Sequence, residues 1–150
     1  MNKKSILIAA SALMLSVSAF AEPASARGFG WRANQVTVEQ NGANNGAAVA
    51  QNGRANNASV LQNGDGHTGI VRQGGDFNGG HVAQRGAGNT ANVTQTGGDN
   101  ALCMLQRGNN LSANITQSGG ESAVYIQTNR GEIYAPSRSI LVRNCARGGG

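Results

Sequence analysis

The sequence predicts an all-β fold: a two-sheet β-solenoid whose strand-turn-strand coils span 22 residues and are built from 11-residue half-repeats. Three observations predict it. Glutamine recurs every eleven residues, the residues before each glutamine alternate in character, and a glycine follows each glutamine two positions later. A fixed period without slippage indicates one small unit stacked on copies of itself. The repeated glutamines are Gln40, Gln51, Gln62, Gln73, Gln84, Gln95, Gln106 and Gln117.

The first element, residues 1–21, has the pattern of a secretory signal peptide, and we expect it to take no part in the fold. Lys3 and Lys4 give a positive start, residues 6–19 are apolar, and small residues precede a cleavage site between Ala21 and Glu22. The apolar stretch is too short for a membrane anchor. Residues 22–33 then form a short non-repeat N-terminal segment.

Residues 34–127 hold the repeats, the ninth of which ends at Gln127 after a turn one residue shorter. In the half-repeat, asparagine stands six positions before glutamine, a small residue four before, and a larger aliphatic residue two before. These constant residues fall at every second position, which is the period of a β-strand, so they share one face. The repeated asparagines are Asn34, Asn45, Asn56, Asn78, Asn89 and Asn100.

Glycine and polar neighbours after each glutamine provide the turn chemistry that a tight reversal needs. The turn glycines are Gly42, Gly53, Gly64, Gly75, Gly86, Gly97, Gly108 and Gly119. Folding two half-repeats face to face places glutamine opposite asparagine, and the aliphatic residue opposite the small one. Each coil then lies about 4.8 Å from the previous one, with identical residues in register. We expect the buried amides of both glutamine and asparagine to form side-chain ladders along the stack.

Composition excludes several functions. The chain has 23 glycines and few aromatic residues, and its net charge of +5 becomes +3 once Lys3 and Lys4 are removed. It shows no nucleophile–base set or paired carboxylates, so we predict no enzyme. Stacking aromatics are too scarce for nucleic acid. His67 and His81 lack the companions that a metal site needs, so we expect no metal and no cofactor.

The ends of such a stack carry unpaired backbone groups and unfilled amide ladders, which form a template for another chain. A head-to-tail contact that does not close propagates a filament. Nothing in residues 34–127 has the pattern of a cap. The pattern therefore predicts an amyloid-forming fibre subunit that assembles by cross-β stacking, with itself as its first partner.

The motif Gln-x-Gly-x-x-Asn-x-Ala-x-x-x-Gln occurs at 40–51, 51–62 and 84–95. It resembles the curlin repeat, found in the secreted amyloid subunits of bacterial curli fibres. The resemblance covers about residues 34–127. It implies export through the outer-membrane curli machinery, assembly with itself or other curlin-type subunits at the cell surface, and roles in adhesion and biofilm matrix. The Gly-rich export segment typical of the family's major subunit is absent, so major and nucleating roles both stay open.

The tail, residues 128–150, is basic: its four arginines outnumber the single acidic residue, Glu132. That charge favours an anionic outer-membrane surface; the alternative is a solvated tail. Cys103 lies at an outward position of the repeats, and Cys145 lies in the tail. An even cysteine count in an exported chain favours an intramolecular disulfide between them, with free thiols or an intermolecular link as alternatives.

A second class of function is a monomeric secreted β-solenoid that binds a surface such as polysaccharide or ice. Such a protein would repeat one residue type outward. The middle outward row, read in chain order, shows no such regularity: it is Thr37, Ala48, Ser59, Ile70, His81, Asn92, Cys103 and Asn114. The regularity lies inside, which favours the fibre subunit.

Overall fold

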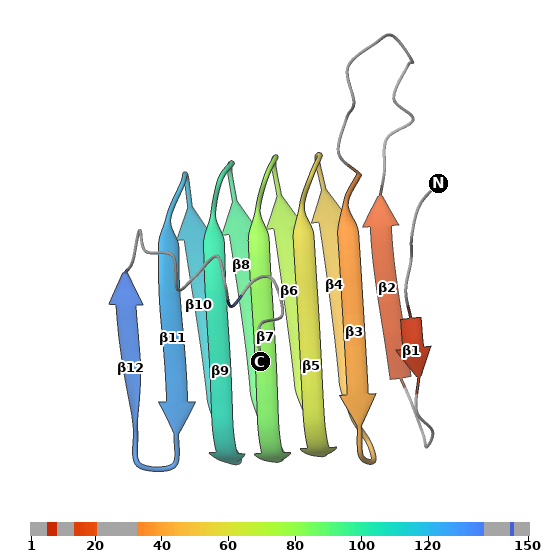
Figure 1. Cartoon of the computed structure of the whole chain (residues 1–150), viewed down its shortest axis with the longest axis vertical. Coiled ribbons are helices and arrows are strands. Elements are labelled where there is room, and N and C mark those ends of the chain that lie inside the picture. Colours follow the sequence, from red (N-terminus) through yellow and green to blue (C-terminus); the bar gives the residue numbers. More distant parts are fainter. Residues whose placement is uncertain (1–5, 9–13, 21–32, 137–144, 146–150) are drawn as a thin grey trace, which may run out of the picture.

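Nine strands alternate between two sheets along the repeats (Figure 1). The computed structural model describes residues 6–8, 14–20, 33–136 and 145, and only the backbone of the first two ranges. Sheet A contains β3 (Gln35–Asn41), β5 (Asn57–Asp65), β7 (Gly79–Ala87), β9 (Ala101–Asn109) and β11 (Ser122–Thr128). Sheet B contains β4 (Gly46–Asn52), β6 (Thr68–Gly74), β8 (Thr90–Thr96) and β10 (Ser112–Ser118). The predicted two-sheet β-solenoid is confirmed.

Neighbouring strands of the repeats are parallel and in register, one coil apart. Gln40 lies beside Gln62 on the next strand of sheet A, and Gln51 lies beside Gln73 in sheet B. The repeated glutamines of each sheet therefore lie beside their own kind. The described part of the chain contains no helix long and apolar enough to cross a membrane.

The core is a thin layer of small and medium aliphatic side chains between the sheets. Val60, Val71, Val82 and Val93 are fully buried, as is Ala58. The large and small positions face each other as predicted: a methyl group added to Gly69 would contact Val60, and one added to Gly80 would contact Val71. Because each side chain buries little apolar area, the amides between the sheets must contribute much of the specificity.

The turns stack as closely as the strands do. Gly75 has φ +103°, and a Cβ placed on it would fall on the carbonyl oxygen of Gly97 in the next coil. The turn backbones are also hydrogen-bonded between coils, for example from the Gly75 amide to Asn52 O at 2.9 Å. Glycine is needed in these turns because of both its backbone conformation and the close approach of the next coil.

A further strand, β12 (Gly131–Pro136), follows the repeats within the residues predicted to be a tail. It turns back at Asn129 and Arg130 and pairs antiparallel with β11, opposing Glu132 to Gln127 and Tyr134 to Tyr125. Sheet A therefore ends in an antiparallel strand at its C-terminal edge. The rest of the tail beyond β12, apart from Cys145, lies outside the described residues.

Two short strands lie in the predicted signal peptide. β1 (Ile6–Ile8) pairs with β3, and β2 (Met14–Phe20) pairs with β4, both parallel. The expectation that residues 1–21 take no part in the fold thus differs from the structure of the whole chain. The physical reason is that β3 and β4 are edge strands, and an adjacent apolar segment can pair with their free backbone groups. The predicted cleavage site at Ala21 and Glu22, and almost all of the 22–33 segment, lie outside the described residues.

Candidate functional site

Two glutamine ladders run through the interior, one in each sheet. In every step the Nε2 of one glutamine donates to the Oε1 of the glutamine one coil later, at 2.5 to 2.9 Å. Sheet A carries the ladder Gln40, Gln62, Gln84, Gln106 and Gln127, and sheet B carries Gln51, Gln73, Gln95 and Gln117. All donors point toward the C-terminal end, so both ladders have the same polarity.

From Gln51 onward, the second hydrogen of each ladder amide crosses the core. Gln51 Nε2 also donates to Gln35 O at 3.0 Å, and Gln62 Nε2 donates to Gly46 O at 3.0 Å, in each case on the facing sheet. One side chain therefore joins neighbouring coils and also joins the two sheets. Such fully satisfied buried networks specify a unique register.

The first rung of each ladder is incomplete. Gln40 Oε1 and Gln51 Oε1 are buried acceptors without a hydrogen-bond partner among the described residues. The residues in register with them on β1 and β2 are Ile8 and Ala19, and neither residue type has a side-chain donor. A buried unpaired acceptor costs about 1–3 kcal/mol. The N-terminal end thus presents two acceptors that a donor amide would satisfy.

The last rungs are incomplete in the opposite sense. Gln127 Nε2 donates across to Ser112 O at 3.1 Å, and Gln117 Nε2 to Ala101 O at 3.4 Å. Neither has a following glutamine to receive its other hydrogen within the described chain. One end of the stack therefore offers acceptors and the other end offers donors, which is the chemistry of a head-to-tail contact.

The asparagines act differently from the prediction, which placed them in side-chain ladders. Asn45 Nδ2 donates to Gly64 O, and Asn56 Nδ2 to Gly75 O, both at 2.8 Å and both in the next coil's turn. Asn56 Oδ1 in turn accepts the backbone amide of Asn78, at 2.9 Å. Asparagine is one methylene shorter than glutamine and lies beside the turn, so it reaches turn backbone first. Asn100 does make a side-chain step, donating from Nδ2 to Asn78 Oδ1 at 2.9 Å.

His67 takes an asparagine position and reproduces its acceptor role. Its Nδ1 accepts the backbone amide of Asn89 at 3.2 Å, and its Nε2 lies 3.2 Å from Asn63 O. These contacts assign the proton to Nε2. The ring therefore replaces an asparagine within the stack.

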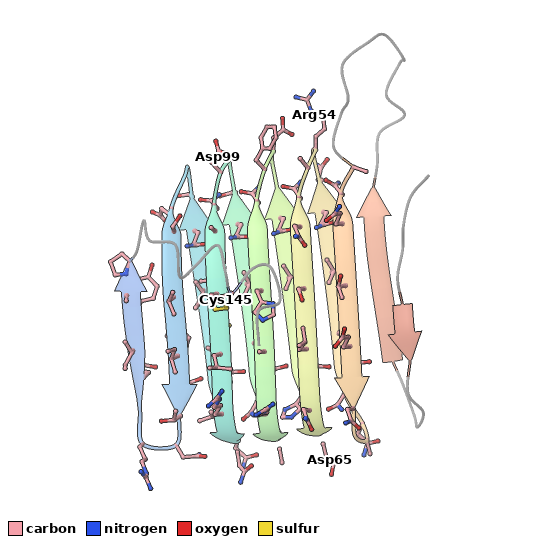
Figure 2. The ribbon with its side chains drawn as sticks, viewed as in Figure 1. Arg54, Asp65, Asp99 and Cys145 are labelled. Carbon is pink, nitrogen blue, oxygen red and sulfur yellow. A yellow bond between two sulfur atoms is a disulfide. The ribbon has the colours of Figure 1, made fainter. Side chains whose placement is uncertain are left out.

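Charged turn residues join neighbouring coils at the two edges of the solenoid (Figure 2). Arg54 and Asp99 lie at one edge and Asp65 at the other. The Asp65 carboxylate accepts a hydrogen bond from the Ala43 backbone amide at 2.7 Å. The Asp76 carboxylate accepts hydrogen bonds from both the backbone amide and the guanidinium of Arg54. The side-chain hydrogen bond from Arg54, together with the backbone one, holds the pKa of Asp76 below its ordinary value. Because this pair is exposed, it contributes little to stability.

Cys103 and Cys145 form a disulfide, with their Cα atoms 5.8 Å apart. It places Cys145 against the outer face of β9 (Figure 2). His81, in register with Cys103 on the next strand, is also buried, and burial lowers its pKa. Cys103 and His81 are predicted to point outward; both lie on the outer face of sheet A, and both are nonetheless buried.

Removing the disulfide, by Cys103→Ser with Cys145→Ser, should lower the free energy of unfolding. The bond closes a loop between residues 42 apart, for which the chain-entropy relation gives about 4 kcal/mol. Denaturant unfolding of the variant, followed by circular dichroism, measures this loss. Adding a reductant to the variant should change nothing further, whereas it should bring the parent chain to the variant's midpoint; a parent insensitive to reductant contradicts the prediction.

The outward row that appears irregular in chain order separates into two faces in the structure. Thr37, Ser59, His81 and Cys103 lie on sheet A, and the other four residues lie on sheet B. On sheet B, hydroxyl residues of β8 lie beside hydroxyl residues of β10 in three pairs: Thr90 with Ser112, Thr94 with Thr116, and Thr96 with Ser118. The outward residues appear irregular in chain order because consecutive half-repeats lie on different sheets.

Within the described ranges, no three His, Cys, Asp or Glu side chains gather closely enough to hold a metal ion. The family model of the curlin associated repeat matches the chain three times, at residues 32–64, 42–73 and 64–97. No curated protein matches the chain, and no solved structure does. The matched residues include the first rung of both ladders.

Proposed function

Because this chain is a curlin-repeat protein, we propose that it is a structural subunit of an extracellular curli-type amyloid fibre, in which copies add head to tail. The family supports a fibre subunit in general terms. We further propose that the fibre grows by cross-β stacking through the glutamine ladder of sheet A, and that it serves in cell adhesion and biofilm matrix.

One observation carries the assembly mechanism. Gln40 Oε1 and Gln51 Oε1 are buried acceptors without partners among the described residues at one end. At the other end, Gln117 and Gln127 each have a donor hydrogen that no described glutamine receives. The internal steps of the ladder repeat the same donor–acceptor contact at 2.5 to 2.9 Å. A junction between copies would therefore repeat a bond that the molecule already makes seven times.

We infer the partners and the location from the family resemblance and from the charge pattern of the chain. The predicted signal peptide, cleaved after Ala21, would direct the chain out of the cytoplasm, and the outer-membrane curli export machinery would carry it to the surface. Other curlin-type subunits would join it in the fibre. The basic tail would hold the subunit near anionic outer-membrane lipid.

Fibre growth by the chain from Glu22 onward tests this function. We expect a lag, then dye-binding growth that added seeds accelerate, and a meridional reflection near 4.8 Å from aligned fibres, about the spacing of paired strands. A chain that stays monomeric at high concentration in the presence of its own seeds would rule the proposal out.

The ladder itself is tested on β3 by Gln40→Leu, with Thr37→Leu as a matched control on the outer face of the same strand. Loss of one junction bond of about 1.4 kcal/mol should slow seeded growth about tenfold for Gln40→Leu. The Thr37 variant should grow at close to the parent rate. Equal growth rates of the two variants would contradict growth through the amides.

A surface-binding monomer is the second candidate, and the paired hydroxyl rows on β8 and β10 favour it. It predicts a stable monomer whose binding to polysaccharide or ice falls when Thr94 and Thr116 are replaced by valine. The seeding experiment distinguishes the two functions, since a surface binder would not grow on seeds.

A further inference from the structure

Strand β12 occupies the place in sheet A where the first strand of a following copy would stack. Along the stack, β11 follows β9 in parallel, and the next parallel neighbour would be β3 of another molecule. Instead β12 lies there, antiparallel, as the last strand of the sheet (Figure 1). A head-to-tail junction and the β11–β12 hairpin therefore exclude each other.

β12 is a poor substitute for a repeat strand. All six of its residues are exposed, with Ile133 at 63% and Tyr134 at 52%. It places Glu132, not a glutamine, opposite the last ladder residue Gln127. The Glu132 carboxylate instead accepts a hydrogen bond from the Tyr125 hydroxyl, at 2.6 Å. Burial and this contact raise the pKa of Tyr125 to about 12, so the hydroxyl remains a donor throughout the neutral range.

The strand β3 of a second copy fits the same edge better. It would lie parallel to β11 and in register, as β5 lies on β3. Gln127 has a donor hydrogen that no following glutamine receives within the described chain, and Gln40 has an unpartnered acceptor there, so the ladder would continue across the junction. If β12 stayed in place, the unpaired Oε1 of Gln40 would instead face the Glu132 carboxylate, and neither group has a hydrogen to donate. With β12 in place, the junction is blocked chemically as well as spatially.

The disulfide tethers the chain that follows β12. Cys145 is held on β9, and it comes nine positions after Pro136, the last residue of β12. The chain around β12 is therefore fixed at both ends, by the turn at Asn129 and by Cys145. A short tether raises the local concentration of β12 at the β11 edge.

We propose that β12 is a removable cap on the C-terminal growth end, held by the disulfide, and that a second copy of this chain joins only when its β3 displaces β12 from β11. This inference rests on the proposed fibre function. The interaction surface is the edge of β11, and its partner is the edge of β3, which β1 covers in the whole chain and which cleavage after Ala21 would expose. The strand exchange makes growth slow while the cap is closed and fast once it is released.

Locking the cap provides the decisive experiment. Ile126 and Ile133 lie directly opposite each other on β11 and β12 and point away from the core. Their Cα separation in an antiparallel pair is within the range that a disulfide spans. The variant Ile126→Cys with Ile133→Cys, in a Cys103→Ser and Cys145→Ser background, should stop seeded elongation when oxidised. Dithiothreitol, which reduces this bond to two thiols and is itself oxidised, should restore it.

Opening the cap is the complementary experiment. Ile133→Pro removes a backbone donor from β12 and should raise the elongation rate at least about tenfold. Ile133→Thr is its matched control: it removes the same exposed apolar side chain but keeps strand propensity, so it should elongate like the parent. Circular dichroism of each monomer verifies that the coils remain folded.

The fibre function and the cap fail on different results. Growth of the parent with unchanged growth of the oxidised locked variant overturns the cap and leaves the fibre function standing. Slower growth of Ile133→Pro than of Ile133→Thr also overturns the cap. If neither the parent nor the reduced locked variant grows on seeds, the fibre function fails, and the cap proposal fails with it.

Discussion

Gly75→Ala should destabilise the monomer by about 4 kcal/mol, because a side chain there meets two separate obstacles. Gly75 has φ +103°, a conformation that alanine rarely adopts, and the added Cβ would fall on the carbonyl oxygen of Gly97. That oxygen belongs to a backbone held by its own stacked turn, so it cannot move aside cheaply. Denaturant unfolding of dilute, seed-free protein measures the loss.

Gly119→Ala is the matched control for this effect. Gly119 occupies the same position of the half-repeat in the last coil of sheet B, with φ +67°, and a Cβ there would have nothing within 4 Å. Only the left-handed conformation is penalised, by about 1–2 kcal/mol. The difference between the two variants thus isolates the contribution of coil stacking. Similar losses for both would mean that the turns do not pack as the structure describes.

Gln84→Glu should be the most damaging change that preserves the shape of a ladder residue. Gln84 Nε2 donates to Thr68 O, Asn89 O and Gln106 Oε1 at 2.9 to 3.1 Å, while its Oε1 accepts from Gln62. A carboxylate would face three acceptors without a hydrogen to give. Leaving a buried charge unpaired costs about 3–5 kcal/mol. Urea or thermal unfolding at neutral pH would measure it.

The loss should depend on pH in a direction that identifies its cause. Burial among acceptors raises the folded-state pKa of the introduced carboxyl group above its unfolded value, so the neutral acid is the form that the fold tolerates. The penalty is therefore greatest at neutral pH, falls as pH drops through the raised folded pKa, and is least below the unfolded value. Gln35→Glu makes the same change at an exposed glutamine and should show neither the loss nor this recovery. A pH-independent gap between the two variants would contradict the assignment.

The period of the sequence was enough to predict the strands, their two-sheet arrangement and the inward glutamines. Position alone decides these features, because a 22-residue coil brings each glutamine beside the glutamine 22 residues later. The asparagines show where this reasoning fails. An amide can ladder with its neighbour or bind backbone, and the difference between Asn45 and Gln51 depends on the reach of the side chain toward the turn.

The end of the stack was harder to predict than its middle. Ile133 and Tyr134 have high strand propensity and follow Gly131 closely, which was the available signal for β12. They lack the repeat pattern, however, and a six-residue strand forms only because β11 provides an open edge. The disulfide on the outer face of sheet A is similarly non-local, since it joins Cys103 to a cysteine 42 residues away.

The unequal strand numbers of the two sheets have a consequence for any fibre of this chain. The repeats contribute five strands to sheet A and four to sheet B. If β3 of one molecule follows β11 of another, each molecule advances sheet A by about 24 Å, yet leaves one place of sheet B empty. A notch one strand wide then recurs with every subunit, between β10 and the next β4. In its place on β11, β12 already runs in the direction of the sheet B strands (Figure 1), so the segment that closes the isolated molecule is also the piece that would complete the polymer.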